Sequence, residues 1–150
     1  MVLNLITNAA EALGDGAGTI SIRTATLDAA AGDLRQFEPD PLGAGRYVLL
    51  EVSDTGTGIA ESVLARIFDP FFTTKFTGRG LGLAAVIGVV RGHRGGIHVT
   101  TARGHGTTFR VVLPAAEPAE AAVRAAPAAV AEAGRAGRLL LADDEEIVRE

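Results

Sequence analysis

The spacing of apolar residues along the chain predicts two main helices. Apolar residues recur every three to four positions over residues 1–13, and Gly14 and Gly16 follow as a stop. Residues 81–91 are almost wholly apolar, so we expect a second helix that is buried on most sides. A shorter helix is predicted near residues 61–68.

Four further segments have the alternation and the β-branched content of strands. They are residues 19–26, 46–53, 97–101 and 107–113. The run Val48-Leu-Leu predicts a central position for the second strand, and the glycines and prolines of residues 28–45 predict a surface hairpin loop before it. The order of elements predicts an α/β (α+β) two-layer sandwich, with an antiparallel or mixed sheet and helices on one face.

The composition changes after residue 114. Residues 115–137 contain twelve alanines, two prolines and no aromatic residue, which is typical of a linker. Residues 138–150 begin with an apolar, strand-like run that leads directly into acidic residues. Residues 115–150 carry the whole net charge of −4, because the ten basic and ten acidic residues of 1–114 cancel. We therefore expect a domain over residues 1–114, a linker, and the beginning of a second domain.

The overall composition excludes several classes of protein. A hydrophobic fraction of 47% and a charged fraction of 21% exclude disorder throughout, and the negative net charge argues against direct nucleic-acid binding. The absence of cysteine excludes disulfides and thiolate metal sites. No apolar run approaches the roughly 18–20 residues that span a bilayer. We expect a cytoplasmic chain, and any membrane anchor of the intact protein would lie upstream of residue 1.

Asn4 and Asn8 are one helical turn apart and therefore share a face of the first helix. Buried carboxamides need hydrogen-bond partners, so the pair has a purely structural interpretation as core or capping residues. It has a second interpretation as a metal site, because an amide oxygen suits Mg²⁺ that is shared with substrate phosphates. The pair alone does not decide between the two.

Two glycine-rich segments indicate a nucleotide site. Asp54-Thr-Gly-Thr-Gly58 follows a predicted strand, where a carboxylate can accept a hydrogen bond from an exocyclic amine; a tight turn is the alternative. Gly78-Arg-Gly-Leu-Gly-Leu83 opens the second helix, whose free N–H groups suit phosphates. This segment does not follow a strand, and no glycine-lysine-Ser/Thr sequence occurs, which argues against a dinucleotide-binding fingerprint and a P-loop.

Five motifs in a fixed order carry a specific family resemblance. They are Asn4/Asn8, Asp54-x-Gly-x-Gly58, Phe68-Asp-Pro-Phe-Phe-Thr-Thr-Lys75, Gly78-x-Gly-Leu-Gly82 and Gly104-x-Gly-Thr-Thr-Phe109. Their order and approximate spacing resemble the N box, the glycine boxes and the F box of the ATP-binding domain of sensor histidine kinases. The resemblance covers residues 1–114. It implies the Bergerat (GHKL) α/β sandwich, which gyrase and the heat-shock chaperone ATPases share.

The resemblance implies a site for ATP and Mg²⁺. It assigns Asn8 to Mg²⁺, with Asn4 as a further catalytic residue, and Asp54 to the adenine amino group. It makes residues 71–80 a mobile lid, with Lys75 as a phosphate partner. The other implied ATP-binding residues are Gly56, Gly58, Ile59, Gly78, Gly80, Leu81, Gly82, Leu83, Thr107 and Thr108.

Several neighbouring residues have other expected roles. Phe68, Phe71 and Phe72 are expected to pack the lid and to form a docking surface, Glu11 is expected on a solvated helix face, and Arg79 reaches either a phosphate or solvent. The acidic residue that follows the phosphoacceptor histidine in the family is absent after every histidine of this chain. Those histidines are His93, His98 and His105.

The resemblance also implies partners. Family members carry a dimerising helical hairpin with the phosphorylated histidine, and then about one strand and one helix, ahead of the N box. We therefore expect Met1 to begin inside the N-box helix, the phosphoacceptor to lie upstream, and the intact protein to be a homodimer. Residues 139–146 resemble the start of a receiver domain in cis, in which Asp143 and Asp144 would help to hold Mg²⁺. A response regulator or phosphotransfer protein would be a further partner.

These features predict the ATP-binding catalytic part of a hybrid sensor histidine kinase, inactive as an isolated fragment. The intact enzyme would move the γ-phosphoryl group of Mg-ATP to a histidine and then to a receiver aspartate. The alternatives are a GHKL-type ATPase, an anti-sigma serine kinase, and a nucleotide-binding module with no activity of its own. ATPases of this fold place a glutamate where this chain has Asn4, and an amide cannot act as a general base. The receiver-like tail argues against the serine kinase.

Overall fold

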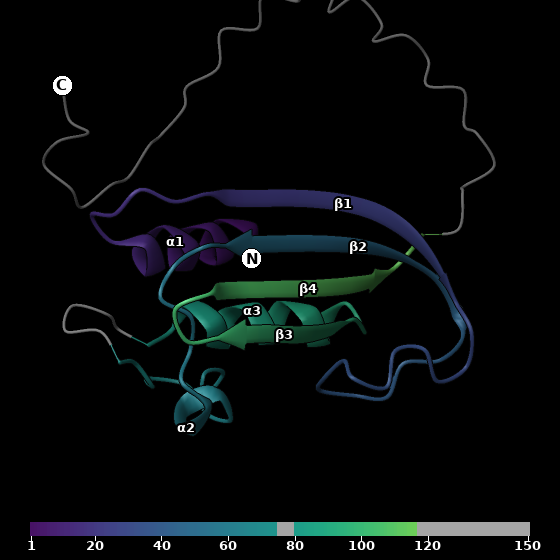
Figure 1. Cartoon of the computed structure of the whole chain (residues 1–150). Helices are drawn as coiled ribbons and strands as arrows, with labels where there is room; N and C mark the ends of the chain where they lie inside the picture. The colour runs from purple at the N-terminus through teal and green to yellow at the C-terminus, as the bar shows by residue number, and fades with distance from the viewer. Residues whose placement is uncertain (75–79, 117–150) are drawn as a thin grey trace, which may run out of the picture. The chain divides into compact units, whose positions relative to one another are not determined.

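The computed structural model describes residues 1–74 and 80–116, which form one antiparallel sheet covered by helices (Figure 1). The strands are β1 (Ile20–Ala29), β2 (Gly45–Asp54), β3 (Gly96–Ala102) and β4 (Gly106–Pro114), in the order β1-β2-β4-β3. The helices are α1 (Val2–Leu13), α2 (Glu61–Leu64) and α3 (Gly82–Gly92). α1 and α3 lie on the same face of the sheet, so the predicted two-layer sandwich is confirmed.

The helical pattern of the first thirteen residues produces α1 as predicted. Leu5 and Ala9, one turn apart, are buried against the sheet. The helix ends where Gly14 adopts a φ of +59°, a conformation that glycine accepts without steric cost. Burial of one face therefore fixes the rotation of α1, and with it the direction in which Asn8 points.

The core between the helices and the sheet consists of alternate residues of the two central strands. Val52 of β2 and Phe109 and Val111 of β4 pack with Val86 and Val90 of α3. β2 lies between β1 and β4, so the predicted central position of this strand is confirmed. Because side chains alternate along a strand, Asp54 points to the same face as Val52 and therefore toward the helices.

The prediction that the second helix is buried on most sides is wrong. Only Val86 and Val90 of α3 are buried, whereas Ala85, Gly88 and Val89 are exposed. Leu81, immediately before the helix, is 44% exposed. Two of the three exposed positions, Ala85 and Gly88, carry a methyl group or no side chain, so they lose little by remaining in solvent. α3 thus has an exposed apolar face.

The segment between β1 and β2 is more than the surface loop that its glycines and prolines predict. Leu34 and Phe37 are buried and pack with Tyr47 and Val112 on the outer face of the sheet, the face opposite the helices. The main chain of Glu38 exchanges two hydrogen bonds with Ile97 of β3, at 2.9 and 2.8 Å. The segment therefore builds a second small core and covers part of the β3 edge.

The rest of the outer face is polar. Ser53 and Thr108, which pair across β2 and β4, are hydrogen-bonded through their hydroxyl groups at 2.8 Å. Glu51 accepts a hydrogen bond from Arg110 at 2.8 Å. On the other edge of the described sheet, β1 pairs only with β2, and its side chains are mostly exposed. Within the described ranges no helix is long and apolar enough to cross a membrane.

Candidate nucleotide site

Asp54, the last residue of β2, is a firmly held polar residue of the candidate site. Its side chain is buried, with only 5% of the residue exposed. Oδ1 accepts hydrogen bonds from the main-chain N–H groups of Gly56 at 2.8 Å and Thr107 at 3.3 Å. No described residue donates to Oδ2. The carboxylate is thus held in one orientation by two N–H groups and keeps one oxygen as an acceptor for a ligand.

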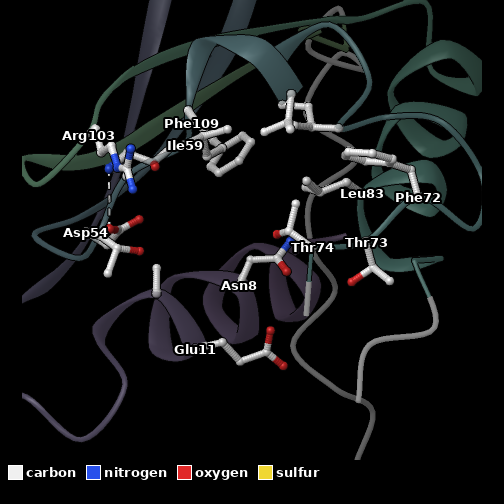
Figure 2. A pocket seen from close by; sticks show the side chains of 17 residues that line it. Asn8, Glu11, Asp54, Ile59, Phe72, Thr73, Thr74, Leu83, Arg103 and Phe109 are labelled. Carbon is white, nitrogen blue, oxygen red and sulfur yellow. Dashed lines mark hydrogen bonds between the residues drawn. The ribbon is translucent and has the colours of Figure 1, made fainter. Parts of the chain in front are cut away.

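Asp54 lies at one end of a cavity of about 550 Å³ between α1, the sheet and the segments around α2 (Figure 2). That volume is within the usual range of small-molecule sites. Most of the lining is apolar, with polar groups at a few places. The lining residues are Asn8, Glu11, Ala12, Asp54, Thr57, Gly58, Ile59, Ala60, Val63, Ile67, Phe72, Thr73, Thr74, Leu83, Arg103, Thr107 and Phe109.

The loop after Asp54 contains glycine because neighbouring backbone leaves no room for side chains. A Cβ at Gly56 would lie 2.5 Å from the carbonyl oxygen of Ala12, and one at Gly58 would collide with the carbonyl oxygen of Ala102. Gly58 also has a φ of +68°. Gly106 is equally constrained, because its Cβ would collide with the carbonyl oxygen of Asp54. These glycines let the loop pack tightly between α1 and the β3–β4 turn.

Asn8 and Asn4 have different surroundings although they share a helix face. Asn8 lines the cavity, and its Nδ2 is buried without a hydrogen-bond partner among the described residues. Such an atom is costly unless a ligand or solvent satisfies it. Asn4 lies outside the lining, and its Nδ2 donates to the carbonyl oxygen of Gly82 at 3.0 Å. Asn8 therefore belongs to the cavity, and Asn4 links α1 to the start of α3.

The base of the predicted lid is fixed by a short backbone contact. Phe71 N–H donates to the carbonyl oxygen of Gly80 at 2.9 Å, which brings the two ends of the segment together. Phe71 has a φ of +66° and is 76% exposed, a rare and strained combination for an aromatic residue. Phe72 turns inward, lines the cavity and lies under the guanidinium of Arg66, 4.4 Å from the ring centre.

The structure gathers about half of the predicted nucleotide residues around one cavity. Asn8, Asp54, Gly58, Ile59, Leu83 and Thr107 line it. Gly56, Gly80 and Leu81 lie in the adjoining loops and Gly82 is the first residue of α3; none of the four is in the lining. Lys75, Gly78, Arg79, Asp143 and Asp144 lie outside the described residues.

One predicted residue faces away from the cavity. Thr108 was expected beside Thr107 beneath the nucleotide, but it points to the outer face, where its hydroxyl group pairs with that of Ser53. Adjacent residues of a strand point to opposite faces, so only Thr107 can face the cavity. Thr101 of β3 supports Thr107 there, because the two hydroxyl groups lie 3.0 Å apart.

Sequence reasoning missed several lining residues. Val63, Ile67 and Phe109 form apolar walls; Val63 and Ile67 belong to no site motif, and Phe109 ends the fifth motif but was not among the predicted ATP-binding residues. Phe72 was expected to pack the lid rather than to line the site, and Glu11 was expected to face solvent. Nothing in the sequence indicated that Arg103 lines the site, since it lies in a glycine-rich turn between strands. Figure 2 shows how these residues from distant parts of the chain surround one space.

Fold and cavity together define an ATPase-type α/β sandwich. Residues 1–117 match the HATPase_c family, described as histidine kinase-, DNA gyrase B-, and HSP90-like ATPase. The chain is 38% identical to the sensor kinase CckA of Brucella abortus over 99% of its length, and 42% identical to the sensory histidine kinase/phosphatase NtrB of Rhizobium meliloti over 77%. It spans only 16% and 29% of those two relatives.

Solved structures give the same result. The mycobacterial sensor histidine kinase MprB aligns with a TM-score of 0.55 and 32% identity, over 75% of this chain and 66% of that one. Full-length ShkA in complex with AMPPNP aligns with a TM-score of 0.58 and 30% identity, over 78% of this chain and 22% of that one. The chain belongs to the HATPase_c family, and within it has the catalytic domain of sensor histidine kinases.

Proposed function

We propose that this chain binds Mg-ATP in the cavity beside Asp54 and supplies the catalytic domain of a hybrid sensor histidine kinase. The observation that carries the proposal is the buried carboxylate of Asp54, held by two main-chain N–H groups at the end of a largely apolar cavity. A planar base fits such walls, and its exocyclic amine has one fixed acceptor. The AMPPNP that ShkA binds in the related structure is an ATP-like ligand, which supports this assignment.

At the end of the cavity beside Asp54, groups of the chain bind and orient the adenine ring. Oδ2 of Asp54 accepts a hydrogen bond from the adenine amino group, while Oδ1 stays occupied by Gly56 and Thr107. Ile59 and Phe109 provide apolar surface for the ring faces. Because the acceptor is already in place, nucleotide binding does not have to reorganise the carboxylate.

At the phosphate end, the described residues fit a magnesium ion that is shared with a nucleotide. The carbonyl oxygen of the Asn8 amide is a hard ligand suited to Mg²⁺, and its unsatisfied Nδ2 is a donor that suits a phosphate oxygen. Bound there, Mg²⁺ would neutralise charge on the β- and γ-phosphates. Gly80, Leu81 and Gly82 approach the phosphates at the start of α3, and Lys75 and Gly78 complete this end in the proposal.

The exposed apolar surface near the lid suits a protein partner. Phe71, Leu81 and Val89 are all exposed, and Phe71 is hydrogen-bonded to the residue that precedes Leu81. We assign this surface to the helical hairpin that carries the phosphoacceptor histidine. A strained backbone that keeps an aromatic ring in solvent is typical of a functional contact.

The further partners belong to the same proposal. The intact protein is a homodimer that exchanges phosphate with a receiver domain and with a response regulator or phosphotransfer protein. Asp143 and Asp144 hold the receiver's Mg²⁺ in this proposal. The alignment with CckA supports it, because it covers 99% of the chain and so extends beyond the residues that match the ATPase family.

Hydrolysis of ATP by water is the alternative activity. Asn4 offers no carboxylate and its amide is bonded to Gly82, which favours phosphoryl transfer over hydrolysis. Glu11, however, lines the cavity one turn after Asn8. Glu11→Gln distinguishes the two activities. Glutamine cannot act as a general base, so the variant should lose hydrolysis by water, but it has the same size as glutamate, so phosphoryl transfer should remain.

The experiment supplies the chain with labelled ATP, Mg²⁺ and the helical hairpin of its own full-length kinase. We expect acid-labile label on the hairpin and none on His93, His98 or His105 of the chain itself. Asn8→Ala should abolish the transfer, whereas Thr7→Ala, on the exposed side of the same helix, should not. Label on the chain's own histidines, or full transfer by the Asn8 variant, would contradict the assignment.

A further inference from the structure

Arg103 lines the nucleotide cavity although it lies in a turn with no recognisable motif. The turn joins β3 to β4, and Figure 2 shows the arginine in the wall of the cavity that also contains Asp54. It is the single arginine or lysine among the described lining residues. A cation in a nucleotide cavity can contact either the phosphates or the base, and the position of the turn that carries it decides between them.

The turn is held against the base end of the cavity by contacts on both sides of Arg103. Ala102 packs on Gly58, and Gly104 N–H donates to the carbonyl oxygen of Thr57 at 2.7 Å. Gly106 packs on the backbone of Asp54, and the next residue, Thr107, donates to its carboxylate. The backbone of Arg103 is thus fixed next to the loop that carries Asp54, whereas Asn8, Thr73 and Thr74 lie in another part of the lining (Figure 2).

The guanidinium of Arg103 has no competing partner among residues 1–74 and 80–116. Within these ranges it makes no hydrogen bond and no ion pair, even with Asp54, which lines the same cavity. Five of the seven other described arginines form ion pairs with carboxylates, among them Arg66 with Asp69 and Arg110 with Glu51. Folding therefore leaves Arg103 available to a ligand.

We propose that Arg103 is a base-recognition residue, whose guanidinium covers the purine ring of the nucleotide while Asp54 accepts from its amino group. The guanidinium is planar and weakly hydrated, and it stacks well on aromatic rings. Ile59 and Phe109 provide the apolar surface on the protein side, and Arg103 adds a flat cationic surface from the turn. This inference rests on the proposed function, because it needs an adenine nucleotide in this cavity.

The test compares adenosine with ADP on the full chain by calorimetric titration. Removing a side chain that contacts the base should weaken the binding of both ligands equally, whereas removing one that contacts phosphate should weaken only the binding of ADP. We expect Arg103→Ala to weaken both ligands by the same factor, about fivefold to twentyfold. Arg103→Lys keeps the charge but not the planar group. Its binding free energy for each ligand should therefore lie closer to that of Arg103→Ala than to that of the unsubstituted chain.

Two controls make the outcome specific. Arg23→Ala removes an exposed arginine of β1 on the outer face and should leave both affinities unchanged. The melting temperature of Arg103→Ala should match that of the unsubstituted chain, because no described contact is lost. Weakened ADP binding with unchanged adenosine binding would overturn the base assignment, and so would unchanged affinities for both. If the unsubstituted chain bound neither ligand, the proposed function itself would fail.

Discussion

The side-chain amide of Asn4 donates a hydrogen bond to the carbonyl oxygen of Gly82, 78 residues further along the chain, at 3.0 Å. This bond joins the first turn of α1 to the first residue of α3. It also gives a structural role to a residue that the sequence assigned to catalysis. The two roles differ in what a substitution would change.

Replacing Asn4 with alanine should destabilise the chain by about 1–2 kcal/mol, because a part-buried carbonyl group loses its donor. Replacing it with aspartate should cost more, since a carboxylate would face the carbonyl oxygen of Gly82. Urea unfolding measures both effects, with Thr7→Ala as the matched control for loss of a polar side chain from α1. Unchanged stability with abolished phosphoryl transfer would instead support the catalytic role.

Replacing Asp54 with asparagine should weaken ADP binding about tenfold or more, because a hydrogen bond to a charged acceptor contributes about 1.5–3 kcal/mol. An asparagine at this position can still accept from Gly56 and Thr107 through its oxygen, but it presents a donor to the adenine amine. Calorimetric titration is the measurement, and Asp28→Asn on the exposed part of β1 is the control. Undiminished affinity in the Asp54 variant would remove Asp54 from the site.

Replacing Gly106 with alanine should destabilise the fold far more than replacing Gly104. Both glycines have positive φ, +86° and +78°, so both substitutions cost about 1–2 kcal/mol of backbone strain. Only the Cβ at position 106 would also collide with the main chain of Asp54, whereas the space around Gly104 is open. The difference in stability between the two variants, measured by thermal unfolding, reports the cost of the collision alone. Equal losses of stability would mean that Gly106 and Asp54 are not packed as described.

Replacing Phe71 with glycine should raise the stability of the chain by about 1 kcal/mol and lower its ability to phosphorylate the helical hairpin. The stabilisation comes from relief of the positive φ, and nothing buried is lost because the ring is 76% exposed. Urea unfolding and the transfer assay give the two readouts, and ADP affinity should stay the same. Ile22→Ala, an exposed apolar residue of β1, is the control. Undiminished transfer would show that Phe71 does not contact the hairpin.

The chain by itself should associate or lose solubility through β1. This strand pairs only with β2 in the described sheet, and its Ile22 is 49% exposed. An open strand edge with apolar residues is a template for pairing with another chain. Size-exclusion chromatography with light scattering should show dimers or larger species, and Ile22→Lys should increase the monomer fraction. A monodisperse monomer that melts cooperatively would contradict this expectation.

The sequence predicted the sheet well because the strand segments are rich in β-branched residues, and the apolar run Val48-Leu-Leu fits a strand with neighbours on both sides. The alternation of side chains along a strand could have excluded Thr108 from the site, since it follows Thr107 directly on β4. The burial of α3 could not be predicted from its composition, because an apolar composition does not show which face of the helix lies against the sheet. Leu34 and Phe37 were hidden among glycines and prolines, and nothing local indicated that they pack on Tyr47.

The candidate site was predictable where motifs carry it and not where three-dimensional packing creates it. Asp54 and Asn8 lie at recognisable spacings, and both line the cavity. Val63, Ile67 and Arg103 reach the same space only because the chain returns to it from α2 and from the β3–β4 turn. Gly56 and Gly58 were predicted as ATP-binding residues, but the structure gives a second reason for them: close packing against Ala12 and Ala102.

The carbonyl group of Ala12, in the last turn of α1, accepts a hydrogen bond from the N–H of Thr57, in the loop that follows Asp54, at 3.0 Å. The helix that carries Asn8 therefore cannot fray without releasing the loop that carries the adenine acceptor. The end of α1 and the Asp54 loop are therefore joined by a direct hydrogen bond. The hydrogen bond between Phe71 and Gly80, in contrast, joins only the two ends of the segment 71–80. Slow hydrogen exchange should accordingly be shared by α1 and the Asp54 loop. Nucleotide entry and release would then leave the base pocket assembled between turnovers.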